Sequence, residues 1–436
     1  MSGRFPIMRS LDPHHQRIGY LGALALIAYR GLDTKDAVRA RLDAMLFEKI
    51  RAGSAEYEAL MEDVPVDRRE SLASLRKERK DEENPASVLY EKDEVSDWLY
   101  ASELWLYQAC MPSTKGALAR NRVDRVIDFA RWTGMLTPTT ELSETGFLVQ
   151  LLLEQCRNAN PRPLLFNPLN PRPRLGLSLL YLRLLLAAEM LWPSLVLELV
   201  NRSDSKRTLA TRGEDGLLQA SVARLLDDVG QPTDPSDMLD LRDITDFRQS
   251  IASKPSTEEN YLRPRLELLL DLDLVSRDSD KARNKQEFPW IPTPRTRTLA
   301  EEWARLVHGG NHIPDYLENG FFRSMARVYQ VDAQRVADSR IMLLWFARAF
   351  HSVGREFGFT PGRTLALMAC ILALEAGQVL EVSEVFDAVY KAAKSEWGEY
   401  LRFSGGSRFD REFMIRIQPG LEESLDQSIK SRPEVL

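Results

Sequence analysis

The chain has 436 residues, of which 44% are apolar and 28% are charged, and its formal net charge is −6. This length exceeds what one hydrophobic core usually serves, so we expect several domains. The apolar content speaks against a disordered chain, and the negative charge speaks against a surface that binds nucleic acid everywhere, although local basic patches stay open. The abundance of Leu, Ala, Arg and Glu favours helix over strand.

The cysteines and the apolar runs indicate a cytoplasmic protein. Cys110, Cys156 and Cys370 lie far apart in apolar helical contexts, so we expect buried thiols in a reducing compartment. The first residues lack the apolar region of a secretory signal. The runs Leu175–Leu191 and Leu365–Ala376 are short or interrupted by charged residues, which predicts core helices and no membrane span.

Four segments follow one another along the chain. Residues 1–84 should form a helical hairpin and a charged linker, and residues 85–159 a first module. Residues 160–315 should form a second module, with an acidic insert at 202–255 that we expect to be a surface excursion. Residues 316–436 should form a C-terminal helical region that could include a third module.

The first module is predicted from the segment around Val123. Val123, Val126, Ile127 and Ala130 follow the spacing of one helix face, and the helix should end at Gly134. An apolar pair, a Thr/Pro turn and the sequence Leu-Ser-Glu-Thr-Gly then lead into another helix. We therefore expect a helix over 120–133, a short strand, a turn and a further helix.

A second stretch repeats this apolar pattern at one offset. Setting Asn121 against Asn260 aligns Ile127 with Leu266 and also matches the apolar pairs that follow, which we interpret as a weak internal repeat. A helix over 263–272 should therefore also be followed by a strand and a turn. The sequence FPWIPTPRTRTLAEEW then predicts a last strand that runs into a closing helix.

The third module is predicted from the sequence EYLRFSGGSRFDREFMIRI. Two alternating strands around Gly405-Gly406 indicate a hairpin whose tight turn should bring Phe403 and Phe409 near each other. The helix over 361–377 is apolar nearly all round and should be buried. Ser383 is the expected N-cap of the next helix.

Together, the helix, glycine, apolar pair, turn and closing helix resemble the recognition helix and wing of the winged-helix superfamily. The resemblance covers about half the chain. It implies a mainly α, multi-domain fold with two or three winged-helix-like modules that carry small β-hairpin wings. Winged helices bind double-stranded DNA, and they also serve as protein-docking modules.

Motifs for common catalysis are absent from the sequence. It has no phosphate-binding loop, dinucleotide fingerprint, serine-hydrolase elbow or paired-cysteine zinc motif. His308 and His312 have helical metal spacing, but the glycines between them favour a loop. His351 lies among aromatic residues and is expected to pack. We therefore expect no cofactor, no metal and no enzymatic activity, although an unfamiliar activity stays open.

Basic residues of the three modules are the candidate functional residues. The candidate DNA contacts are Arg122, Arg125, Arg263, Arg265, Lys281, Arg283, Lys285, Arg402, Arg408 and Arg411. Arg122 and Arg125 fall opposite the apolar stripe of their helix, where an arginine could contact DNA in the major groove. Neighbouring Asp124 and Asp128 favour an ordinary solvated face instead.

The leading hypothesis is a non-enzymatic multi-winged-helix protein that binds double-stranded DNA, with phosphate contacts from the wings. The alternative is a protein-docking assembly subunit of a chromosome-handling or phage-defence complex, with a kleisin-like or accessory role. Protein partners are expected in either case. An enzyme without a familiar motif is the third hypothesis. The sequence leaves open the oligomeric state and whether the modules face DNA or protein.

Overall fold

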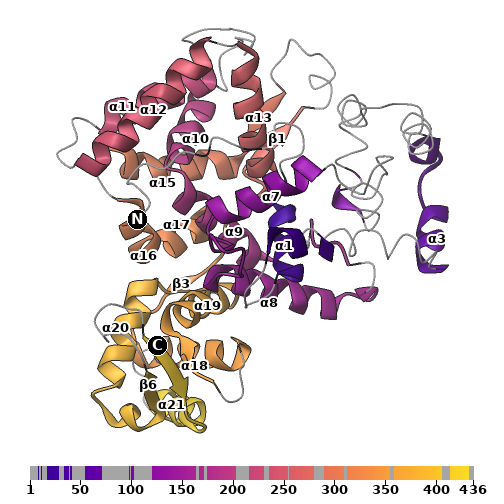
Figure 1. The fold of residues 1–436 in the computed structure, drawn as a ribbon. Coiled ribbons are helices and arrows are strands. Elements are labelled where there is room, and N and C mark those ends of the chain that lie inside the picture. The colour runs from indigo at the N-terminus through magenta and orange to yellow at the C-terminus, as the bar shows by residue number, and fades with distance from the viewer. Residues whose placement is uncertain are drawn as a thin grey trace. The chain divides into compact units, whose positions relative to one another are not determined.

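The structure is a computed structural model. It describes residues 8, 11, 17–28, 34–38, 40–41, 55–70, 98, 100–102, 120–163, 166–170, 174–202, 216–229, 235–253, 255–278, 289–308, 312–353, 358–404 and 413–431. The expected mainly α fold is confirmed, with helices and small two- and three-stranded sheets. The chain divides into unit 1 (Met1–Arg174 and Leu184–Arg297) and unit 2 (Leu175–Arg183 and Thr298–Leu436) (Figure 1). The four sequence ranges given above stay a prediction.

Unit 1 is built from helices around a leucine-rich core. Its helices are α1 (Gly19–Ile27), α3 (Ala55–Glu62), α7 (Arg120–Trp132), α8 (Glu144–Ala159), the end of α9 (Leu175–Ala188), α10 (Leu191–Arg202), α11 (Leu217–Val229), α12 (Pro235–Ser253) and α13 (Pro255–Asp271). Helix α1 packs against α7 and α8 and buries Leu21 and Leu24 completely. The second arm of the expected N-terminal hairpin lies mostly outside the described residues.

The succession expected after residue 120 is confirmed except for its short strand, in whose place there is an isolated β-bridge. Helix α7 ends at Trp132, two residues before Gly134, whose φ of 72° is the left-handed conformation that glycine adopts without cost. Leu136 and Leu142 then form an antiparallel bridge. Helix α8 begins after Ser143, whose hydroxyl accepts a hydrogen bond of 3.0 Å from the amide of Gly146.

The second stretch has the same succession. Helix α13 ends at Asp271, two residues before Asp273, which has a φ of 56°, and β1 (Val275–Arg277) then pairs antiparallel with β2 (Trp290–Pro292) before α15 (Pro294–His308). At the repeat offset, Asp273 is the equivalent of Gly134. The acceptors of the helix-ending hydrogen bonds are also equivalent, because Leu136 donates to the carbonyl of Ala130 and Leu274 to that of Leu269.

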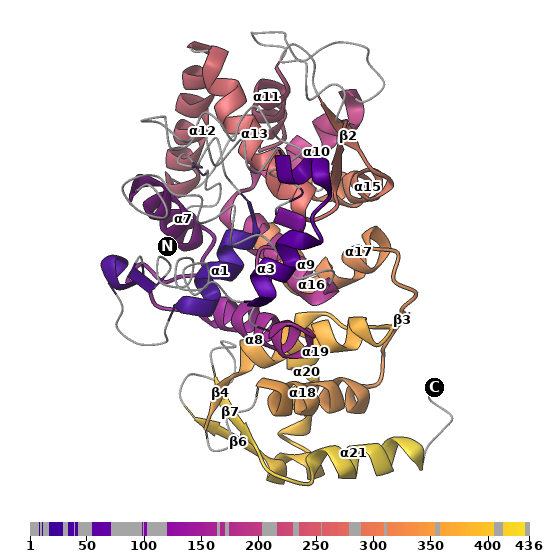
Figure 2. The same cartoon turned by 90° about the vertical axis from the view of Figure 1, so that its right-hand side faces the viewer.

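The acidic insert is not a surface excursion, and that expectation is wrong. Residues 202–255 contain α11 and α12, and α11 packs against α10 and α12. Figures 1 and 2 show α11, α12 and α13 side by side. Leu217, Val222 and Phe247 are buried, because the apolar residues of this acidic stretch follow helical spacing and face the core.

Residues 166–170, in the Pro-rich stretch that follows α8, form a packed segment. Phe166 and Leu169 are buried, and the side-chain Nδ2 of Asn167 donates to the carbonyls of Tyr100 and Ser102 at 2.7 and 2.8 Å. These bonds satisfy two backbone carbonyls of residues 100–102 and hold the segment against them.

Unit 2 combines helices with two small sheets. It contains the first part of α9, most of α15, α16 (Ile313–Asn319), α17 (Phe321–Val328), β3 (Gln334–Arg335), α18 (Ser339–Val353), β4 (Thr360–Pro361), α19 (Gly362–Glu375), β5 (Gln378–Val379), α20 (Val382–Ala392), a 3-10 helix (Glu396–Tyr400), β6 (Leu401–Ser404), β7 (Met414–Ile417) and α21 (Leu421–Lys430). Helix α18 packs against α19, α20 and α21. The expected burial of the helix over 361–377 is confirmed in α19.

Unit 2 contains a three-stranded sheet in which β7 lies between β4 and β6 (Figure 2). Leu401 pairs with Ile417 and Ser404 with Met414. The expected hairpin is confirmed, but its tight turn is wrong, since a two-residue turn at Gly405-Gly406 would pair Ser404 with Ser407. Residues 405–412 lie outside the described part, and with them the expected neighbour Phe409.

Aromatic packing explains this register. The ring of Phe403 lies 5.2 Å from that of Phe413 between centroids, in an edge-on arrangement, and Phe413 also contacts Phe386 of α20. Phe413 is buried and directly precedes β7. Its packing on α20 therefore fixes the position of β7 along β6.

The N-cap of α20 is Glu381 and not Ser383. Glu381 forms a capping box with Glu384, whose carboxylate accepts from the Glu381 amide at 3.1 Å. The buried carboxylate of Glu381 also accepts the amides of Phe322 and Arg323, at 3.2 and 2.9 Å, at the start of α17. One carboxylate therefore serves two helix N-termini, where negative charge is favourable.

Candidate functional site

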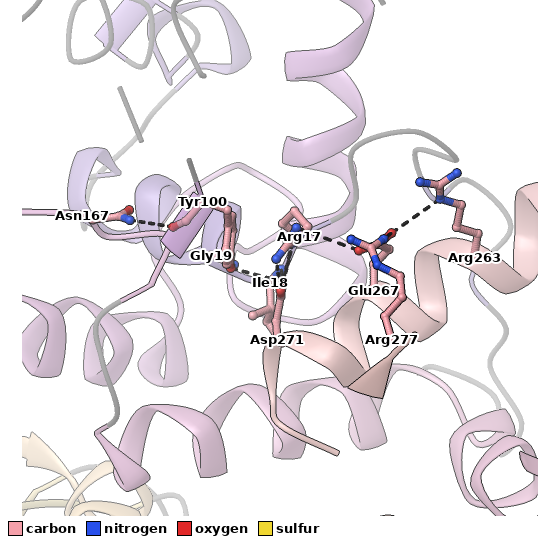
Figure 3. A network of polar contacts seen from close by, with 9 residues as sticks. All are labelled: Arg17, Ile18, Gly19, Tyr100, Asn167, Arg263, Glu267, Asp271 and Arg277. Carbon is pink, nitrogen blue, oxygen red and sulfur yellow. Dashed lines mark hydrogen bonds and ion pairs between the residues drawn. The ribbon is translucent and has the colours of Figure 1, made fainter. Parts of the chain in front are cut away.

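A buried polar network joins α1 to α13 in unit 1 (Figure 3). The guanidinium of Arg17 lies 2.6 Å from the carboxylate of Asp271 and 3.7 Å from the centre of the Tyr100 ring. Asp271 also accepts from the amide of Ile18 at 2.8 Å and from the hydroxyl of Tyr100 at 3.2 Å. Burial lowers the pKa of Arg17, but the charges of Asp271, Tyr100 and Glu267 and the hydrogen bond to Asp271 together outweigh burial, and the net direction is upward. Arg17 is therefore positively charged and pairs with Asp271.

Arg263, one of the candidate DNA contacts, belongs to this network. Its Nε lies 3.5 Å from the carboxylate of Glu267, which also lies 3.3 Å from Arg277 and 3.9 Å from Arg17 (Figure 3). These side chains connect α13 with β1 and with Arg17, which lies two residues before α1. The arrangement offers no nucleophile or acid–base pair, and it holds the fold together.

Arg265 cannot contact DNA, so the expectation for this residue is wrong. The side chain is fully buried, and its guanidinium donates to both oxygens of Glu189 and to the carbonyls of Met8 and Tyr261. The sequence prediction failed because Arg265 lies on the core side of α13, where a carboxylate from the end of α9 neutralises it.

The surface of α7 carries charges of both signs. Arg125 is exposed, as expected. The α7 residues Asp124 and Asp128 lie 3.7 and 3.2 Å from Lys35, which belongs to the N-terminal part of the chain. On α7 itself, Arg131 lies 3.6 Å from Asp128. These ion pairs favour the ordinary solvated face. The side chain of Arg122 lies outside the described residues, as do Lys281, Arg283, Lys285, Arg408 and Arg411.

The hairpin of unit 2 presents two arginines on one face. Arg402 of β6 and Arg416 of β7 are directly opposite in the register, Arg402 is exposed and Arg416 is half-buried. Their strand neighbours Leu401, Ile415 and Ile417 point into the core. Among the described residues, neither arginine has an ion pair or a side-chain hydrogen bond. Arg416 was missed in the sequence, although the alternation of Met-Ile-Arg-Ile places it outward.

The solvent side of α20 has a different character. Asp387 and Lys391 are exposed and Glu384 is half-buried. The carboxylate of Glu384 lies 2.7 Å from Arg335 and 3.9 Å from Arg323. The exposed groups that this helix offers to a ligand are therefore the carboxylate of Asp387 and the amine of Lys391.

Two charges inside the apolar run after residue 175 have buried partners. Arg183 lies 2.9 Å from Glu318, and Glu189 pairs with Arg265. Among the described helices, none alone is long and apolar enough to cross a membrane, and only the bent pair of α9 and α10 meets that measure together.

The described histidines and cysteines form no reactive centre. No group of three or more metal-ligating side chains occurs in the part of the chain that the structure describes. His351 is exposed rather than packed, and its Nδ1 lies 3.0 Å from Glu422. Cys370 is buried, and burial raises the pKa of its thiol, whereas Cys156 is half-buried.

Comparisons with known proteins give no relative. No protein-family model, no curated protein and no solved structure matches the chain.

Proposed function

We propose that the protein is a non-enzymatic, cytoplasmic, double-stranded DNA-binding protein with winged-helix-like modules. The topology of unit 2 carries this proposal. Helix α18, strand β4, helices α19 and α20, and the β6–β7 hairpin follow one another, and β7 lies between β4 and β6. This order supports an assignment of α20 to the recognition-helix position and of the hairpin to the wing.

Two further observations support winged-helix-like modules in unit 1. Helices α7 and α13 are each followed by a left-handed residue, an antiparallel strand pair or bridge, and a capped helix. Exposed Arg125 on α7 and exposed Arg402 on β6 offer the positive charge that phosphate contacts need.

A second candidate function, docking on a protein partner, is favoured by α20. The exposed carboxylate of Asp387 on its solvent side would repel DNA phosphates, whereas it could pair with a basic side chain of a protein. In that case the protein is an assembly subunit, as the alternative hypothesis states.

Salt-dependent binding separates the two functions. Fluorescence anisotropy of the full chain with a labelled 30-base-pair duplex, measured over a series of salt concentrations, should give a log affinity that falls linearly with log salt. The same series is measured for R122A/R125A and for K281A/R283A/K285A. Removing one arginine or lysine that neutralises a phosphate should flatten the slope by about one unit. No salt-sensitive affinity for the duplex in the wild type would overturn DNA binding in favour of docking.

A further inference from the structure

We propose that Arg402 and Arg416 form a two-arginine clamp for the phosphate backbone of duplex DNA, and that the hairpin, not α20, is the part of unit 2 that contacts DNA. This inference rests on the proposed DNA binding and specifies its contact surface. It assigns Arg416, which no sequence pattern had singled out, and it reverses the role expected of a recognition helix.

The register places the two guanidinium groups on one face of the hairpin. Side chains directly opposite in an antiparallel pair have Cβ atoms about 5 Å apart. Arg402 and Arg416 are such a pair, and the pairs on either side, Leu401 with Ile417 and Phe403 with Ile415, face the other way. Both charges therefore project from the same place on the sheet.

Two like charges in this position are unfavourable without a counter-ion. Opposed like charges destabilise a strand pair, and among the described residues no carboxylate pairs with either arginine. Other surface arginines of unit 2 do have partners, such as Arg327 with Glu302 at 2.8 Å and Arg335 with Glu384 at 2.7 Å. Among the described residues the two hairpin arginines have no such partner, so an external anion could compensate their charge.

The chemistry of the pair suits a phosphodiester. A guanidinium presents a planar fork of donors that matches phosphate oxygens, and two forks side by side can hold one phosphate or two neighbouring ones. A helix inserted in the major groove would have to bring the exposed carboxylate of Asp387 on α20 close to the phosphates, which costs electrostatic energy. The hairpin has no described carboxylate in its outward row.

The test uses the full chain, a labelled 30-base-pair duplex and the double variant R402A/R416A. The matched control is R305A, which removes an exposed arginine of α15 in the same unit. At 0.1 M salt we expect the double variant to bind about tenfold more weakly per arginine and its salt slope to fall by about two units, because two fewer counterions are released. R305A should keep the wild-type slope. R402K/R416K keeps both charges and should keep most of the slope with weaker affinity.

Two further measurements define the ligand and the face. D387N, which neutralises the exposed carboxylate of α20, should leave the salt slope unchanged if α20 faces away from DNA. Without DNA, R402A/R416A should unfold at a temperature equal to or above that of the wild type, because a like-charge pair has been removed.

Each failure has a separate signature. Wild-type protein without salt-sensitive duplex binding overturns the proposed function, and the clamp with it. Wild-type binding together with an unchanged slope in R402A/R416A overturns the clamp alone. A polyglutamate of matched charge that competes as well as the duplex overturns DNA as the ligand.

Discussion

The guanidinium of Arg265 and the carboxylate of Glu189 form a bidentate ion pair from which solvent is excluded, with Nε 2.9 Å from Oε2 and Nη2 2.6 Å from Oε1. The backbone of Met8 completes the pair, because its amide donates to Glu189 at 3.0 Å and its carbonyl accepts from Arg265 at 2.9 Å. Segments far apart in the sequence thus meet at one compensated charge pair in the core of unit 1.

Breaking this pair should destabilise unit 1 strongly. R265M leaves the carboxylate of Glu189 buried without its cation, and we expect a loss of about 3–5 kcal/mol in the free energy of unfolding. R263M, which removes a partly exposed arginine on the same helix that pairs with Glu267 at 3.5 Å, should cost less than R265M. Urea unfolding followed by circular dichroism measures both. A loss in R265M no larger than that in R263M would contradict the role of the pair.

Asp271 should matter far more than its neighbour Asp273. D271N removes the charge that faces Arg17 in the network of Figure 3, and the buried guanidinium then costs about 3 kcal/mol. Asp273 is exposed and pairs with Arg295 at 3.3 Å, so D273N should change stability by about 1 kcal/mol or less. Asn also tolerates the left-handed conformation of this position. Equal thermal midpoints for the two variants would argue against the network.

Gly146 should resist substitution because the start of α8 packs closely against the backbone of Met135, which follows α7. A Cβ at Gly146 would lie 2.3 Å from the carbonyl oxygen of Met135, so G146A must move backbone. We expect a loss above about 2 kcal/mol. At Gly134 a Cβ meets nothing within 4 Å, and G134A should cost about 1 kcal/mol through its positive φ alone. The order of the two losses in chemical unfolding checks the close approach, and the reverse order would refute it.

Glu381 should make the stability of unit 2 depend on pH. Burial raises the pKa of this carboxyl to about 7, against the opposing hydrogen bonds from the amides of Arg323 and Phe322. The unperturbed pKa is 4.5. Between these two values the folded state binds more protons than the unfolded state, so the contribution of Glu381 to stability falls as pH rises through this window. The full change is about 3 kcal/mol.

The variant E381Q isolates this contribution. The difference in unfolding free energy between wild type and E381Q should fall from pH 4.5 to pH 7 and become level above pH 7. E423Q, which neutralises an exposed carboxylate on α21, is the control and should keep the wild-type pH profile. Parallel profiles for wild type and E381Q would show that Glu381 does not titrate in this window.

Helix positions, helix ends and helix order could be predicted from the residues alone. The spacing of Val126, Ile127 and Ala130 predicts α7, Gly134 predicts its end and Ser143 the start of α8, because helix periodicity and capping are local properties. The alternation around Phe403 and Ile415 likewise predicted a hairpin. In each case, the residues that act together lie within a few positions of one another.

Which charged residues face solvent depends instead on tertiary packing. Arg263 and Arg265 differ by two positions on α13, yet the side chain of Arg263 is partly exposed and that of Arg265 is buried against Glu189. Arg402 and Arg416 lie opposite each other because of the register between β6 and β7, which the buried ring of Phe413 fixes. Burial and register are set by residues distant in sequence, and local propensity carries no information about them.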